Sequence, residues 1–202
     1  MRLKELKLDW KLTLVIVYST LALIVNRYHD LLGHPIYDGL VIYFVIPVLM
    51  IVLLFREPLT DYGFRIGEWR AGLIFTVGSC VVMGLILLLV ASTADFQTYY
   101  TYYLNTLPLP IPIATLIELF AWEFFFRGFL FFALYRLFGP YAILLQAVPF
   151  ALAHLGKPEL ETLSCIFGGS AFGYLAWRTR SFLYPFLIHW FITTVTLLIA
   201  GG

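Results

Sequence analysis

Residues 118–137 read ELFAWEFFFRGFLFFALYRL, a run of aromatic and aliphatic side chains interrupted by a few charges. This run is as long as the roughly 20 apolar residues that cross a bilayer as a helix. The rest of the chain is similar, because 61% of its 202 residues are hydrophobic and only 12% are charged. Soluble domains are about 45–50% apolar and about 25% charged. The sequence therefore predicts an all-α fold, a polytopic bundle of transmembrane helices.

Apolar segments divide the chain into about seven predicted spans. We place them at about 11–26, 39–55, 72–92, 109–137, 140–155, 162–177 and 182–200. Gly139-Pro140 predicts a helix end followed directly by a new helix start. Residues 56–70 are polar and are expected to lie at the membrane surface. Residues 1–108 thus form N-terminal transmembrane helices around this interfacial segment, and residues 109–202 form a second group of core helices.

The basic residues are unevenly distributed between the two sides that these spans define. Ten of the 13 lie on one side: Arg2, Lys4, Lys7, Lys11, Arg56, Arg65, Arg70, Arg136, Arg178 and Arg180. The other side has only Arg27 and Lys157. Because basic loops are retained in the cytoplasm, we expect a cytoplasmic N-terminus and an external C-terminus. No small-x-small cleavage site follows the first span, which is therefore expected to be a retained anchor. Scattered loop charges give no reason to expect nucleic acid as a partner.

Five ionisable side chains remain inside the predicted spans: Glu118, Glu123, Arg127, His154 and His189. A charge left at the centre of a helix in hydrocarbon costs at least ~2.5–3.5 kcal/mol. We therefore expect these groups to face a bundle interior or a wet cavity, which is typical of a functional site. Glu123 and Arg127 are four residues apart and share one helix face. Taken alone, they are equally well interpreted as a pair that only holds the bundle together.

The histidines extend this pattern to other spans. His154 alone is typical of an interfacial residue, and His189, one turn before Thr193, could be a buried hydrogen-bonded side chain. Together with a carboxylate they indicate chemistry, because a carboxylate can activate water as a general base and a histidine can share that water or stabilise an oxyanion. This set favours amide hydrolysis without a covalent intermediate. The sequence has neither a Gly-x-Ser-x-Gly motif nor a His-Glu-x-x-His motif, so no serine nucleophile, metal or other cofactor is expected.

Three ordered motifs resemble those of a known family. Trp122-Glu123-x-x-x-Arg127, Phe150-x-x-x-His154 and His189-x-x-x-Thr193 resemble the Glu-Glu-x-x-x-Arg, Phe-x-x-x-His and His-x-x-x-Asn/Asp motifs of the CPBP intramembrane proteases, the CAAX prenyl endopeptidases and their bacterial Abi relatives. The resemblance covers about residues 109–195, including a turn at 177–181 typical of bacterial members. It implies a hydrolase of the bacterial inner membrane that cleaves a membrane-associated peptide or protein. The catalytic residues it implies are Glu123, Arg127, His154, His189 and Thr193.

Two positions depart from the family pattern. Trp122 stands where the family has its first glutamate, which is thought to activate water with the histidine of the second motif. Thr193 replaces an asparagine or aspartate. We expect Glu123 to serve as the base, with Glu118, one turn before position 122, as the alternative. A further interpretation is a catalytically silent relative with an immunity or scaffold role. A cysteine-dependent transpeptidase using Cys165 is a third, although a cysteine in a span is more often an apolar filler.

Two other patterns have structural interpretations. Gly169-x-x-x-Gly173 predicts a close contact between helices. Tyr99, Tyr100, Tyr102 and Tyr103 predict an aromatic belt at the membrane interface, and the alternative for this cluster is a surface that docks substrate.

Overall fold

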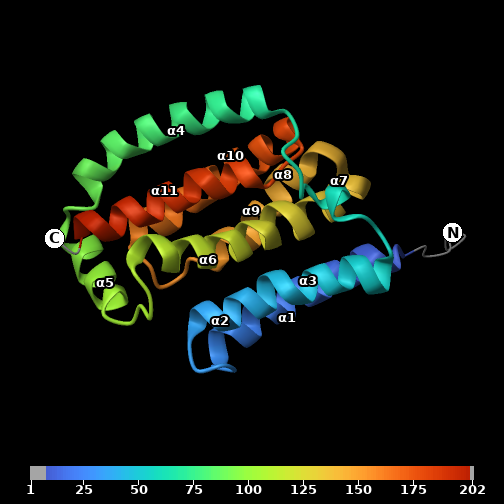
Figure 1. Ribbon diagram of the computed structural model, residues 1–202, viewed down its shortest axis with the longest axis horizontal. Coiled ribbons are helices and arrows are strands. Elements are labelled where there is room, and N and C mark those ends of the chain that lie inside the picture. The colour runs from blue at the N-terminus through green and yellow to red at the C-terminus, as the bar shows by residue number, and fades with distance from the viewer. Residues whose placement is uncertain (1–7, 201–202) are drawn as a thin grey trace, which may run out of the picture.

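The computed structural model describes residues 8–200, and every regular element in that range is a helix (Figure 1). This confirms the predicted all-α fold. Five helical stretches are long and apolar enough to cross a membrane. Their outer surfaces are apolar as well, with Ile74 and Leu89 exposed by 74% and 77%. Large apolar side chains on the outside of a bundle indicate a lipid rather than an aqueous environment.

The N-terminal part makes three passes. The first is α1 (Trp10–Tyr28), and the third is α4 (Trp69–Val90). The second runs from Pro35 to Phe55 and alternates α-helical with π-helical turns: α2 (Pro35–Leu40), η1 (Val41–Val45), α3 (Ile46–Leu49) and η2 (Met50–Phe55). Between the second and third passes lies the short 3₁₀ turn η3 (Leu59–Tyr62). The predicted interfacial segment 56–70 thus connects two passes at one end of the bundle.

The C-terminal part makes four further passes. After the short helix α5 (Ala94–Leu104), the fourth pass combines α6 (Ile111–Glu123), the π-helical η4 (Phe124–Leu130) and α7 (Phe131–Phe138). The chain reverses at η5 (Gly139–Tyr141), as Gly139-Pro140 predicts, and continues as α8 (Ala142–Leu145) and α9 (Ala147–Leu152). The last two passes are α10 (Glu159–Thr179) and α11 (Leu183–Ala200).

These passes compare closely with the predicted spans. The apolar stretch Ile111–Leu152 contains two of them, 109–137 and 140–155. α10 has 21 residues but is too polar to be among the five most apolar stretches. About seven spans is consistent with this arrangement. The fifth pass is unusually short, because only eleven residues lie between Ala142 and Leu152.

The core is built around η4, whose seven residues are all buried. α10 packs closely against α8 and α9, and the predicted Gly169-x-x-x-Gly173 contact is confirmed there. A Cβ atom added at Gly169 would lie 2.9 Å from the ring of Phe150, and one at Gly173 would lie 2.6 Å from Nε2 of Gln146. Only glycine therefore allows this approach of the two backbones.

The two ends of the bundle differ in charge. α1 begins, and the second pass ends, at the end of the bundle opposite to the C-terminus (Figure 1). At this end Arg56 follows η2, Arg136 and Arg178 lie in the last turns of α7 and α10, and Arg180 follows α10 beside Arg65. Arg2, Lys4 and Lys7, which contribute to the predicted asymmetry, lie outside the described residues, as does Gly202.

Candidate active site

A cavity of 110 Å³ lies between α5, α6, α11 and the segment that follows α9. Four predicted site residues line it: Glu118, His154, His189 and Thr193. Glu123 and Arg127 are not on its wall. The remaining lining residues are Tyr99, Tyr100, Tyr103, Leu119, Trp122, Ala153 and Lys157. This volume holds a few water molecules, since each occupies about 30 Å³ of liquid, but it is smaller than the ~300–1,000 Å³ of typical ligand pockets.

Glu123 lies behind the cavity, where it connects two other motif residues. Its Oε1 atom accepts hydrogen bonds from Nη1 of Arg127 at 3.0 Å and from Nδ1 of His189 at 2.6 Å. Glu123 and Arg127 are both 0% exposed, and His189 is 8% exposed. An ionised carboxylate can only accept hydrogen bonds, so Nδ1 of His189 carries a hydrogen. The other ring nitrogen, Nε2, is then free for a second partner, and Glu123 sets the orientation of the ring.

Arg127 is held in this dry position by aromatic rings and a backbone carbonyl. Its guanidinium carbon lies 3.9 Å from the ring centroid of Phe150 and 5.1 Å from that of Phe172. Its Nη2 atom donates to the carbonyl oxygen of Gly169 at 3.4 Å. Cation–π contacts of this kind gain strength when the cation is removed from water. Arg127 therefore balances the charge of Glu123 without facing the cavity.

The Phe-x-x-x-His motif has a local explanation. Nδ1 of His154 donates to the carbonyl oxygen of Phe150, one turn earlier, at 2.8 Å, and the two rings are 4.5 Å apart at their centroids. This bond places the hydrogen of the neutral imidazole on Nδ1 and leaves Nε2 as an acceptor. The centroids of His154 and His189 are 6.4 Å apart with an angle of 25° between the rings. Two imidazoles thus face one small cavity.

The position that carries a glutamate in the family is occupied by an indole. Trp122 lines the cavity, and its ring centroid lies 5.9 Å from that of His154. A carboxylate is nevertheless present one turn earlier, since Glu118 lines the same cavity and accepts a hydrogen bond from the hydroxyl of Tyr103. Glu118 is therefore the acidic side chain on the cavity wall.

A polar cluster beside α5 was not predicted from the sequence. Lys157 donates to Oε1 of Glu161 at 2.9 Å, and the hydroxyl of Tyr100 donates to the other oxygen of that carboxylate at 2.6 Å. Burial lowers the pKa of Lys157, but the nearby Tyr100 and Glu161 outweigh this effect and raise it well above its usual value. A protonated lysine therefore lines the cavity. The i,i+4 spacing of Lys157 and Glu161 was the available signal.

The other sequence candidates lie elsewhere. Three of the four clustered tyrosines, Tyr99, Tyr100 and Tyr103, line the cavity, whereas Tyr102 is 75% exposed. Cys165 is buried in the aromatic core and is not on the cavity wall.

Comparison with known proteins identifies the segment that contains these residues. Residues 104–195 match the family model described as type II CAAX prenyl endopeptidase, Rce1-like. The match covers all three motifs and confirms the resemblance inferred from them. It supports the function of a CAAX-type intramembrane protease in general terms and, with the apolar helices, an integral membrane location. A search of curated proteins gave no significant match, and a search of solved structures gave none either.

Proposed function

We propose that this chain is an intramembrane endopeptidase that hydrolyses a peptide bond of a membrane-associated substrate with water activated in the 110 Å³ cavity. One observation carries the proposal. A carboxylate, Glu118, and two imidazoles, His154 and His189, line the same cavity within the segment that matches the Rce1-like model. A base must lie within hydrogen-bond reach of the water it activates, and this cavity offers both a base and the space for water.

The sequence led us to expect Glu123 as the general base. The geometry of the cavity supports Glu118 instead. Glu123 is fully buried, and its Oε1 atom is shared by Arg127 and His189. A carboxylate in this position orients and stabilises an imidazolium, as a buried acid does behind a catalytic histidine. Glu118 faces the cavity and has only a tyrosine hydroxyl as its hydrogen-bond partner among the described residues. We therefore assign the base to Glu118 and the orienting role to Glu123.

The proposed reaction needs no covalent intermediate. Water between Glu118 and Nε2 of His154 attacks the scissile carbonyl carbon and gives one proton to the carboxylate. His189, whose ring Glu123 orients through Nδ1, lies beside the developing oxyanion, and the hydroxyl of Thr193 donates to that oxyanion. When the tetrahedral intermediate breaks its carbon–nitrogen bond, the proton on Glu118 passes to the leaving amine. A carboxylic acid and an amine leave as products.

The proposed setting is the bacterial inner membrane with a cytoplasmic N-terminus. The uneven distribution of the basic residues between the two sides that the spans define supports this orientation. In that arrangement the catalytic cavity lies toward the outer side, because α5 and the C-terminal end of α11 share the opposite end (Figure 1). A lipid bilayer and a peptide or protein substrate are then the expected partners.

The test is cleavage of a peptide library by the purified protein in liposomes. Replacing Glu118 by Gln is expected to lower cleavage about 10²–10⁴-fold, which is the usual contribution of a general base. Glu123→Gln should lower it less and change its pH profile, because it acts through His189. Glu68→Gln, in the polar segment before α4, is the matched control and should leave cleavage unchanged. If Glu123→Gln is inactive and Glu118→Gln is fully active, the general base is Glu123 and not Glu118.

A second candidate function follows from Trp122. An indole at the family's glutamate position, in a cavity too small for a peptide, also fits a silent relative with an immunity or scaffold role. Two results together would support the catalytically silent function. The parent protein would cleave no peptide in any lipid tested, and Glu118→Gln and Glu123→Gln would leave its binding of membrane partners unchanged.

A further inference from the structure

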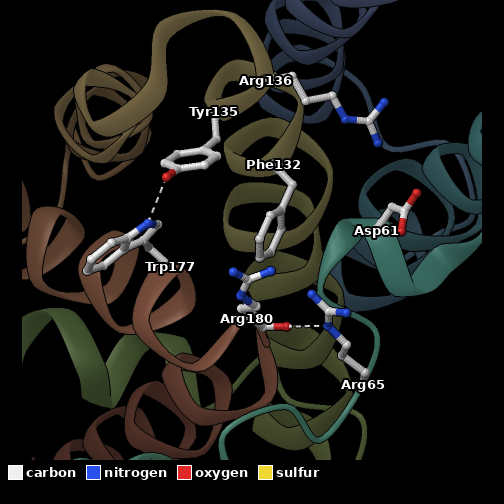
Figure 2. A pocket seen from close by; sticks show the side chains of 7 residues that line it. All are labelled: Asp61, Arg65, Phe132, Tyr135, Arg136, Trp177 and Arg180. Atoms are coloured by element: carbon white, nitrogen blue, oxygen red, sulfur yellow. Dashed lines mark hydrogen bonds between the residues drawn. The ribbon is translucent and has the colours of Figure 1, made fainter.

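A second cavity lies at the end of the bundle opposite to the catalytic one. It has a volume of 280 Å³ and is lined by Asp61, Arg65, Phe132, Tyr135, Arg136, Trp177 and Arg180 (Figure 2). These residues come from the 56–68 connection, from α7 and from the end of α10. The cavity therefore joins three segments that are distant in the sequence, and the proposed peptidase reaction uses none of them.

Arg65 and Arg180 give this cavity its positive charge. Nε of Arg65 donates to the backbone oxygen of Arg180 at 3.0 Å (Figure 2), which holds the two residues together. Arg180 ends α10 in a left-handed conformation with φ of 54°, so that its side chain leaves the helix axis and lines the cavity. Neither guanidinium forms an ion pair with an acid within residues 8–200. Both are therefore available to an anion.

The acids around the cavity do not cancel this charge. Arg136 is already engaged by Glu57, at 2.6 Å. Asp61 also lines the cavity, but its carboxylate lies on the side of Arg136 and forms no ion pair with Arg65 or Arg180 among the described residues (Figure 2). Arginine binds phosphate well because its planar fork of N–H groups matches the geometry of the phosphate oxygens. Two such forks on one wall favour a phosphate group over a single carboxylate.

An aromatic pair provides a further donor. Nε1 of Trp177 donates to the hydroxyl oxygen of Tyr135 at 2.9 Å (Figure 2). The hydroxyl oxygen of Tyr135 thus acts as the acceptor for Trp177. The hydroxyl hydrogen of Tyr135 has no acceptor among the described residues. Figure 2 shows this hydroxyl pointing toward Trp177 and away from Arg65 and Arg180, so Tyr135 offers a separate donor on the cavity wall.

The surroundings identify the source of the phosphate. Apolar Ile66 and Leu137 directly follow the cavity residues Arg65 and Arg136 in the chain, and they are exposed by 66% and 62%. Basic side chains beside apolar surface are typical of sites that bind anionic lipid headgroups. We infer that this cavity binds the phosphate group of an anionic phospholipid, with Arg65 and Arg180 as its donors, Tyr135 as a separate donor on the cavity wall, and the acyl chains along the apolar surface nearby. This inference is independent of peptidase activity.

The experiment measures lipid binding as a rise in the thermal unfolding midpoint of the full chain in maltoside micelles. Dioleoyl phosphatidylglycerol is titrated against the parent, against an Arg65→Gln/Arg180→Gln variant and against an Arg70→Gln/Arg178→Gln variant. The second variant removes two charges from the same end of the bundle that do not line the cavity. Each midpoint shift is taken relative to the lipid-free state of the same variant, so that a change in folding stability does not affect the comparison.

We expect the apparent affinity of the Arg65→Gln/Arg180→Gln variant for phosphatidylglycerol to fall about tenfold or more, because charge-assisted bonds are lost. The Arg70→Gln/Arg178→Gln variant should bind as the parent does, and Tyr135→Phe should show a smaller loss. Equal losses of lipid affinity in both double variants would contradict binding in this cavity, because general surface charge would then explain the binding. Equal stabilisation by phosphatidylcholine would overturn the anionic preference. If inorganic phosphate gives the full shift and abolishes that of the lipid, the lipid assignment is wrong.

Discussion

Nδ1 of His189 lies 2.6 Å from Oε1 of Glu123, and this contact joins residues 66 positions apart in the chain. It links the first and third sequence motifs directly, through α6 and α11. The second motif joins them indirectly, because Phe150 packs against both Arg127 and His189. The three motifs are therefore parts of one buried network, and changes in any of them are expected to reach the other two.

The proposed role of Glu118 predicts a rescue at position 122. We expect Trp122→Glu to restore cleavage in the Glu118→Gln background, to about tenfold or more above the single variant, because it returns a carboxylate to the cavity wall beside His154. Cleavage of a peptide substrate in liposomes is the measurement. Trp122→Gln in the same background is the control, because glutamine is similar in size to glutamate but cannot act as a base. Equal inactivity of both double variants would argue against a base from this helix.

The pair of Glu123 and Arg127 predicts non-additive effects on stability. Arg127→Met is expected to destabilise the protein by about 3–5 kcal/mol, because it leaves a buried carboxylate without its partner. Adding Glu123→Gln should recover part of that loss, since no charge is then left unpaired. A double-mutant cycle of unfolding in mixed micelles measures the coupling between the two residues. Strictly additive losses would mean that the pair is not coupled as its 3.0 Å contact indicates.

Gly169 and Gly168 offer a matched pair of substitutions. A Cβ atom at Gly169 would lie 2.9 Å from the ring of Phe150, whereas one at Gly168 would have no atom within 4 Å. We expect Gly169→Ala to destabilise by about 1–3 kcal/mol through overpacking and to reduce activity by moving Phe150, which supports His154. Gly168→Ala should have little effect on either. Thermal unfolding and cleavage assays on both variants test this, and indistinguishable variants would contradict the close packing.

Glu57 predicts a pH-dependent contribution to stability. It accepts hydrogen bonds from Lys11 at 2.6 Å, Arg136 at 2.6 Å and Tyr62 at 2.7 Å. Burial raises the pKa of Glu57, but these hydrogen bonds outweigh it and lower the pKa to about 2. Because the folded-state pKa lies below that of the unfolded chain, the stabilisation is present at neutral pH and is lost as the pH falls from about 4.5 toward about 2.

We therefore expect Glu57→Gln to lower the stability at pH 7 by about 1 kcal/mol, the scale of a partly exposed charge network. The difference from the parent should shrink steadily below about pH 4.5. Thermal unfolding midpoints of both proteins across this pH range provide the measurement. A difference that stays constant down to the acid end would show that the carboxylate charge is not responsible.

The orientation in the membrane is predicted by the basic loops. A reporter that is active only outside the cytoplasm should be active when fused at Gly202 and inactive when inserted between Arg56 and Glu68. The odd number of passes between these positions and the charge asymmetry both lead to this result. Activity at the inserted position would reverse the orientation and place the catalytic cavity toward the cytoplasm.

Much of the fold was predictable from the sequence, because membrane spans are defined by local composition. The apolar runs and the Gly139-Pro140 break predicted the passes and the reversal. The π-helical turns of the second pass and of η4 were not predictable, since they depend on how neighbouring helices pack. The position of α5 over the cavity was also missed, because its tyrosines are equally suited to a membrane interface.

The site was predictable as a set of residues but not in its detail. Motif spacing led to the prediction that Glu123, Arg127 and His189 belong to one site, and in the structure Glu123 contacts the other two. It could not decide which glutamate faces the cavity, because Glu118 and Glu123 point about 140° apart on an ideal helix and either face could have met the histidines. Only the packing of α11 against α6 determines this, and that packing involves contacts between residues far apart in the chain.

The short fifth pass has a consequence for the surrounding bilayer. The eleven residues from Ala142 to Leu152 extend ~16 Å as a helix, about half of the ~30 Å hydrocarbon thickness. Such a hydrophobic mismatch is relieved when the membrane thins locally or when water enters beside the short helix. His154 and Lys157 follow this pass directly and favour hydration at that depth. We therefore expect bilayer thickness to control how much water reaches the catalytic cavity.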